Sequence, residues 1–243
     1  MQNEVPKQDS DFSSVNSVFT NCILLADKPI GFTSADIVRI FKKSFDIKKI
    51  GHSGTLDPKA TGLLVLCTGK MTKRITEFID YDKEYEGVIK IGVTTKSFDT
   101  ETEEENFKDV SNVTEDDIMK VRESFLGEIS QMPPMYSALK HKGKPLYKLA
   151  RKGREIERKL RTLFVSEFDV WIMSPEEIGF RISSSKGAYI RCIANDFGEK
   201  LGVGGYLKKL RRTRIGNFKL EEFENKIREI PYRIIESKSS DSI

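Results

Sequence analysis

The stretch that most constrains this chain is a loop at residues 51–62, with the sequence GHSGTLDPKATG. It holds three glycines and one proline, so its backbone follows an unusual path or is closely approached by a ligand. Pro58 fixes its own φ and keeps Asp57 away from helical geometry. A carboxylate on such a turn suits a nucleophile or a general base. An aspartate that caps its own turn explains the same residues, and composition alone favours that explanation.

Length and composition indicate one globular core. The 243 residues suffice for one substantial core with a small insertion, and are few for two full domains. A hydrophobic share of 38% with 32% charged residues fits a soluble globular protein. No apolar run approaches the roughly 20 residues of a membrane span. The first seven residues are polar and lack the order of a secretory signal, so we expect a cytoplasmic protein.

The cysteines and histidines argue against a metal centre. Cys22, Cys67 and Cys192 lie far apart in apolar surroundings, which predicts buried, reduced thiols rather than disulfides. His52 and His141 are the only histidines, so soft ligands at useful spacing for zinc are too few. We expect no metal and no organic cofactor.

Charge is strongly segregated along the chain. Residues 140–161 hold ten Lys/Arg against two Glu, and residues 207–214 hold five basic residues in eight. Between residues 99 and 117, nine acidic residues face one lysine, and we expect the first part, 99–109, to be an exposed loop. Two basic blocks with few acidic neighbours are typical of a surface that binds a phosphate backbone. Solvated helical faces are the weaker alternative.

Periodicity predicts the local structure around these features. Thr33 or Ser34 can cap a helix whose apolar stripe is Ile37, Phe41 and Phe45. Thr114 can cap a second helix. Alternation predicts a half-buried strand at 83–93. Further elements are expected as a buried strand at 62–67, a short helix at 72–79, a helix at 146–152, a strand with a core Trp171 at 163–173 and a helix at about 192–200. An extended segment before that last helix would point Tyr189 and Arg191 to one side.

The string GHSGTLDPKATGLL resembles the catalytic-aspartate motif of the TruB family of pseudouridine synthases. These enzymes make pseudouridine 55 in the T-loop of tRNA, and they have RNA-guided relatives in archaea and eukaryotes. Other segments resemble family motifs in the family order: LADKPIGFTS at 25–34, SKGAYIR at 185–191 and GGYLKKLRRTRIG at 204–216. The resemblance runs from about residue 22 to 218. It implies the pseudouridine synthase fold, an α+β domain with a central mixed, mainly antiparallel sheet, flanking helices and a thumb-like insertion.

The resemblance also implies roles for individual residues. Asp57 would be the essential carboxylate, Tyr85 would stack on the target uracil, and Arg191 would hold Asp57 ionised. The substrate-binding residues would be His52, Tyr85, Tyr189, Leu210 and Lys28. Residues available to bind RNA phosphates would be Lys140, Lys144, Lys148, Arg151, Lys152, Arg154, Lys208, Lys209, Arg211 and Arg212. Simpler explanations exist for some of them: Tyr85 and Leu210 as core, and Lys28 as a surface lysine.

The domain plan follows from the same resemblance. We expect a loose tail at 1–20, a catalytic domain at 21–232 with an RNA-binding thumb at 132–161, and a C-terminal tail at 233–243. The thumb contains PPMYSALK and would be mobile without RNA. The short C-terminal end predicts a bacterial-type form without the PUA domain of longer members. The expected partner is the T-arm of tRNA, bound by a monomer.

Two other functions fit the same basic blocks. One is a tRNA-binding or RNA-folding protein, for which an aspartate in a glycine-shaped loop would be unnecessary. The other is the subunit of an RNA-guided synthase, with which Ser53 is compatible. The long insertion and the expected absence of a C-terminal domain weigh against it.

Overall fold

The computed structural model describes residues 19–137, 139–141, 143–221, 223 and 225–235, and only the backbone of Lys140 and His141. Contacts divide the chain into a first unit, Met1–Asp80 with Asn217–Ile243, and a second unit, Tyr81–Gly216. Most of both expected tails, 1–18 and 236–243, lies outside the described residues. The predicted domain boundaries stay a prediction.

The first unit is an antiparallel sheet with helices. Its strands run in the order β14–β15–β1–β3, and β2 pairs with β3. The elements are β1 Ile23–Lys28, α2 Ser34–Ser44, β2 Ile50–His52, β3 Thr61–Thr68, a 3₁₀ helix Gly69–Arg74, α3 Ile75–Asp80, β13 Phe218–Lys219, β14 Asn225–Ile227 and β15 Ile230–Ile235. The predicted buried strand is therefore β3, whereas the predicted helix at 72–79 begins as a 3₁₀ helix.

Helix α2 is stabilised by a capped N-terminus and an apolar stripe, both visible in its sequence. Thr33 accepts a hydrogen bond from the Asp36 amide, and the Asp36 carboxylate accepts one from the Thr33 amide, which completes a capping box. The apolar stripe faces the core, where Phe41 and Phe45 pack against Tyr232 of β15. The predicted cap and stripe are confirmed.

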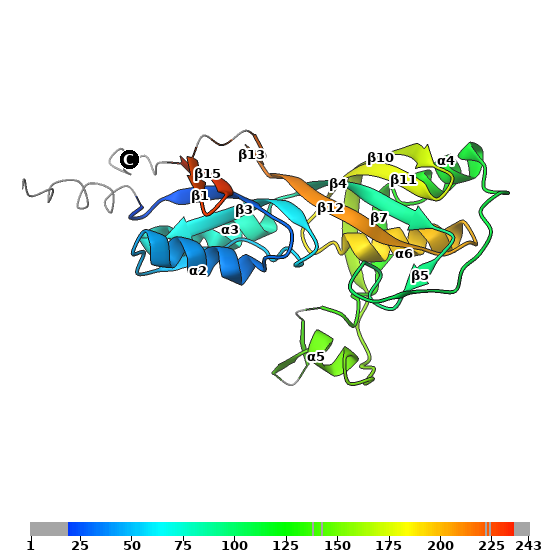
Figure 1. Ribbon diagram of the computed structural model, residues 1–243, viewed down its shortest axis with the longest axis horizontal. Helices are drawn as coiled ribbons and strands as arrows, with labels where there is room; N and C mark the ends of the chain where they lie inside the picture. The colour runs from blue at the N-terminus through cyan, green and yellow to red at the C-terminus, as the bar shows by residue number, and fades with distance from the viewer. Residues whose placement is uncertain (1–18, 138, 142, 222, 224, 236–243) are drawn as a thin grey trace, which may run out of the picture. The chain divides into compact units, whose positions relative to one another are not determined.

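The second unit is a larger antiparallel sheet with strand order β12–β4–β11–β10–β7. The elements are β4 Lys83–Ile91, β5 Thr94–Thr95, β6 Glu104–Glu105, α4 Glu115–Glu123, β7 Gly127–Gln131, β8 Lys140–His141, β9 Lys144–Pro145, α5 Leu146–Ala150, β10 Arg161–Ser174, β11 Glu177–Ser184, α6 Ile190–Lys200 and β12 Gly205–Ile215. Figure 1 shows α5 set apart from the strands of this sheet.

The core of the second unit lies between this sheet and two helices. Phe168 of β10 and Phe180 of β11 make ring contacts with each other, and Phe197 of α6 and Phe125 contact Phe168. All four side chains are buried. The strand pairings within both units are antiparallel, with one isolated parallel bridge between Asp99 and Leu207. The predicted α+β class with a mainly antiparallel sheet is confirmed.

Two expectations in the second unit are wrong. Trp171 is not core but 48% exposed, because it lies near the outer end of β10, where its indole covers Gly179 on β11. The extended segment does not reach Arg191: Tyr189 is extended, but α6 begins at Ile190 and includes Arg191 in its first turn.

Helix α6 also makes direct backbone contact with the start of β12. A Cβ added at Gly198 would lie 2.2 Å from the carbonyl carbon of Gly204 and the amide nitrogen of Gly205. Glycine at position 198 therefore sets the distance between the helix and the strand.

Candidate functional site

The Asp57 loop lies in the first unit between β2 and β3, and hydrogen bonds anchor it on both sides of Asp57. The Leu56 amide donates to the Ser34 hydroxyl at 2.9 Å, and the Gly31 amide donates to the Pro58 carbonyl at 2.8 Å. Leu56 is buried and Asp57 is half-buried. The segment 25–34 thus holds the loop that presents the Asp57 carboxylate.

Lys28 belongs to this support rather than to a surface. Its side chain is fully buried, and its ammonium donates to the carbonyls of Pro29 at 3.0 Å and Phe32 at 2.7 Å. Both the expected surface lysine and the expected RNA contact are therefore wrong. The buried cation needs these acceptors, and they fix the turn that carries Gly31.

His52 is the last residue of β2, where it pairs in register with Leu66 of β3 and is half-buried. It lies five residues before Asp57 in the same unit. Of the predicted site residues, the first unit therefore contains His52 and Asp57, together with Lys28 as support.

Tyr85 and Arg212 face each other across β4 and β12 in the second unit. Tyr85 is 8% exposed and Arg212 is 2% exposed, and their side chains are hydrogen-bonded. Burial lowers the pKa of the Arg212 guanidinium below its ordinary value, while Tyr85 opposes that shift. Arg212 was expected to contact RNA phosphates, and its burial contradicts this. The guanidinium instead holds a residue of the predicted pocket.

Leu210 lies two residues before Arg212 on the same strand and pairs with Gly87 of β4. It is half-buried, so the structure does not place it in the core. Because a side chain is absent at Gly87, the backbones approach closely here: an added Cβ would lie 2.3 Å from the Lys209 carbonyl oxygen.

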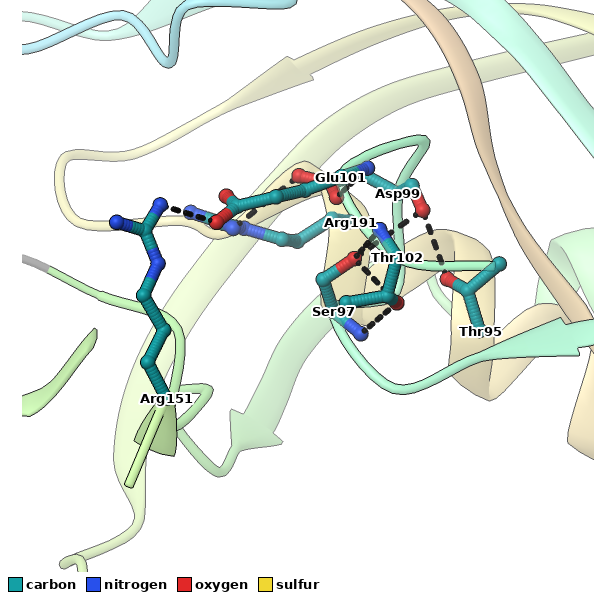
Figure 2. Close-up of polar contacts among 7 residues, drawn as sticks. All are labelled: Thr95, Ser97, Asp99, Glu101, Thr102, Arg151 and Arg191. Carbon is teal, nitrogen blue, oxygen red and sulfur yellow. Dashed lines mark hydrogen bonds and ion pairs between the residues drawn. The ribbon is translucent and has the colours of Figure 1, made fainter. Parts of the chain in front are cut away.

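Arg191 makes a buried ion pair that the sequence did not reveal. Its Nη1 lies 3.2 Å from Oδ2 of Asp99, and the two side chains are 6% and 8% exposed (Figure 2). The Asp99 Oδ1 accepts from the Glu101 amide at 2.9 Å, and its carbonyl accepts from the hydroxyls of Thr95 and Ser97. The loop therefore fixes Asp99 firmly. The expectation that residues 99–109 form an exposed loop is wrong for this residue.

The basic insertion contains eight described cations, of which Arg158 is half-buried and the others are exposed: Lys144, Lys148, Arg151, Lys152, Arg154, Lys159 and Arg161. The side chain of Lys140 lies outside the described residues. Arg151 pairs with Glu101 at 2.6 Å and lies 5.5 Å from the centre of the Tyr147 ring. Figure 2 shows this pair beside the Asp99 loop. Most of the insertion's positive charge therefore faces solvent.

The cations of β12 differ from one another. Lys209 is exposed and Arg211 is half-buried, whereas Lys208 is paired with the Glu177 carboxylate. Burial removes Arg212 from the predicted phosphate-binding set on this strand, whereas the roles of Lys208, Lys209 and Arg211 stay a prediction.

A cleft of about 480 Å³ lies between the end of α4, β7 and α6, and its lining contains none of the predicted site residues. Asp196 and Gln131 are among its lining residues. Burial raises the pKa of Asp196 above its ordinary value. Within the described residues, no group of three His, Cys, Asp or Glu side chains is placed to hold a metal ion. No helix in that part of the chain is long and apolar enough to cross a membrane.

Comparison with known proteins agrees with these motifs. Residues 42–190 match the model of the TruB family pseudouridylate synthase N-terminal domain, and residues 191–228 match that of the tRNA pseudouridylate synthase B C-terminal domain. Both matched domains belong to pseudouridylate synthases, which are isomerases. The chain belongs to the TruB family of pseudouridylate synthases.

Relatives and solved structures support the assignment. The chain is 51% identical to tRNA pseudouridine synthase B of Chloroherpeton thalassium, over 84% of this chain and 89% of the relative. It is 48% identical to that of Chlorobaculum tepidum, over 82% and 85%. A chain of a Cbf5–Nop10–Gar1 complex is 30% identical with a TM-score of 0.67, covering 91% of this chain and 59% of that one. An H/ACA RNP bound to a substrate RNA containing 2′-deoxyuridine contains a chain 28% identical, with a TM-score of 0.64, covering 91% and 57%.

Proposed function

We propose that this protein isomerises uridine to pseudouridine at position 55 in the T-loop of tRNA, with Asp57 as the essential carboxylate. The observation that carries the proposal is the family's catalytic-aspartate motif on a loop whose backbone is anchored on both sides of Asp57. The reaction breaks the C1′–N1 bond of the nucleotide and forms a C1′–C5 bond; C5 loses its hydrogen as a proton to solvent, and N1 takes up a proton.

The target base must leave its stack before this chemistry. Flipping costs a few kcal/mol, and least where a loop is already partly unstacked. In the proposed complex His52 takes the place of the flipped base, Tyr85 stacks on the uracil, and Tyr189 and Leu210 complete the pocket. Half-burial of His52 and Leu210 supports these roles, because both retain exposed surface for a ligand.

Arg191 is proposed to act on Asp57 as a cation that favours the ionised carboxylate. The match of residues 185–191 to a family motif supports this role, while the buried pair with Asp99 fixes the guanidinium in the first turn of α6 and shares its charge. Asp99 is then a positioning residue that sequence reasoning missed.

We propose that residues 132–161 act as a thumb on the T-arm. The exposed cations of this insertion and Lys209 of β12 support electrostatic binding of phosphates. The protein would act in the cytoplasm as a monomer. Light scattering coupled to gel filtration measures the molar mass and so tests the monomeric state.

The experiment that tests the function is tritium release from a tRNA transcript labelled at C5 of uridine. Wild type should release about one equivalent of tritium, and product mapping should locate the pseudouridine at position 55. Asp57→Asn should release none while still binding tRNA. Asp46→Asn is the matched control, because Asp46 is an exposed loop aspartate of the same unit. Equal release by Asp57→Asn and wild type would refute the role of Asp57.

The RNA-guided synthase remains the second candidate, favoured by the similarity to the Cbf5-containing structures. Relatives of 43–51% identity that are described as tRNA pseudouridine synthase B favour the stand-alone enzyme. Release from an unguided transcript supports the stand-alone enzyme. Tight, salt-sensitive binding without release by wild type would instead support guided activity or a tRNA-binding protein.

A further inference from the structure

We infer that Gln131 is a positioning residue that fixes the Tyr189–Arg191 segment from the base of the basic insertion. This inference rests on the proposed function, because it assigns a purpose to the segment that carries Tyr189 and Arg191. Its structural part can be tested without any RNA.

The side chain of Gln131 forms two hydrogen bonds with the backbone of one residue. The Tyr189 amide donates to Gln131 Oε1 at 2.8 Å, and Gln131 Nε2 donates to the Tyr189 carbonyl at 3.1 Å. Gln131 is 3% exposed, so these bonds are shielded from water. The carboxamide therefore pairs with Tyr189 as a neighbouring strand would.

Tyr189 is the residue at which the chain enters α6. It is the N-cap of the helix, and no side-chain hydrogen bond caps it. Its carbonyl also accepts from the amides of Cys192 and Ile193 at 3.0 and 3.3 Å. Gln131 thus orients the first peptide of the helix. Arg191 follows two residues later in the first turn, which links this orientation to the guanidinium.

Gln131 occupies a particular place in the second unit. It is the last residue of β7 and pairs with Arg161, the first residue of β10, so it closes the base of the insertion at 132–161. The Cys192 thiol contacts the carbonyl of Met132 at 3.6 Å. Two consecutive residues where the insertion begins, Gln131 and Met132, therefore contact the start of α6.

The consequence for the reaction is geometric. A displacement of the base of the insertion moves Gln131, and with it the Tyr189 backbone and the first turn of α6. Reacting groups misplaced by about 1 Å can cost 10²-fold in rate. We therefore expect loss of the Gln131 bonds to lower the rate of isomerisation roughly 10- to 100-fold, while tRNA affinity changes little.

The test compares Gln131→Met with two controls. Met fills nearly the same volume without either hydrogen bond. Ser130→Ala changes the exposed neighbour on β7, and Ile118→Ala removes buried contacts of α4 and so destabilises the same unit without touching Tyr189. Each variant is assayed below its melting temperature, with enzyme in excess over labelled tRNA, and tRNA affinity and hydrogen exchange of residues 186–192 are measured in parallel.

Support requires a slower single-turnover rate in Gln131→Met, unchanged affinity, and faster exchange of the Tyr189 amide, with wild-type values for Ser130→Ala. A wild-type rate in folded Gln131→Met would overturn the positioning role. Equal rate losses in Gln131→Met and Ile118→Ala would also overturn it in favour of a purely structural role. If wild type itself releases no tritium, the proposed function fails, while the exchange of the Tyr189 amide still decides whether Gln131 holds this segment.

Discussion

The Asp99–Arg191 pair allows a quantitative prediction about the second unit. Asp99→Ala removes a carboxylate whose arginine partner is 5% exposed. Removing one member of a buried ion pair costs about 3–5 kcal/mol of folding free energy. Asp99→Asn keeps an oxygen that accepts from the Glu101 amide but loses the charge, so we expect it to cost roughly 1.5–3 kcal/mol, the worth of a hydrogen bond to a charged group.

Urea unfolding followed by the fluorescence of Trp171 measures this loss. Trp171 is the only tryptophan of the chain and lies on β10 of the second unit, so the signal reports on that unit. The unfolding midpoint should fall while the slope with urea stays constant, because the mutation does not change the surface exposed on unfolding.

Glu101→Gln is the internal control. It breaks the neighbouring Arg151 pair, in which the two side chains are 61% and 33% exposed, so its cost should stay below about 1 kcal/mol. Equal midpoints for Asp99→Asn and wild type would refute the argument from burial. A loss of stability in Glu101→Gln as large as that in Asp99→Asn would show that burial does not distinguish the two pairs.

Three further predictions concern stability and reactivity. Burial raises the pKa of Asp196. The stability that comes from the protonated Asp196 carboxyl is therefore fully present below the ordinary pKa of 3.8 and is lost as pH rises through the raised value. Asp196→Asn should therefore raise the unfolding free energy at pH 7 and have no effect at low pH, and an effect that is constant with pH would contradict this. Burial also raises the pKa of Cys67 and Cys192 to about 12, so native protein should give no reaction with a thiol-specific dye at pH 8, against three thiols per chain after denaturation. Gly62 has a φ of 104°, so Gly62→Ala should cost roughly 1–2 kcal/mol in urea unfolding, and a neutral result would show that the loop relaxes.

The sequence predicted elements well where local chemistry decides them. The helix caps at Thr33 and Thr114 and the alternation of β4 depend on neighbours within a few residues, and all three are present. The three cysteines were predicted as buried free thiols from their apolar surroundings, and the structure agrees.

What the sequence could not predict depends on contacts between distant segments. Asp99 was one of nine similar acidic residues, and only the approach of Arg191 from 92 positions away sets it apart. Arg212 looks like a surface cation in sequence, because nothing local shows that Tyr85 of another strand will lie against it. The acceptors of Lys28 are local, at Pro29 and Phe32, but the sequence does not show that the turn they form is buried. Gln131 gave no signal either, since its partner is the backbone of Tyr189 and not a side chain.

The contact between Gly198 and the start of β12 limits how this protein can vary. Every other amino acid adds a Cβ, which would lie 2.2 Å from backbone atoms that cannot rotate away. No single substitution at this position can therefore adjust the spacing by a small amount, and each would displace either α6 or β12. Gradual change in the second unit must therefore come from side chains and loops elsewhere, because this junction allows only glycine without displacement of an element.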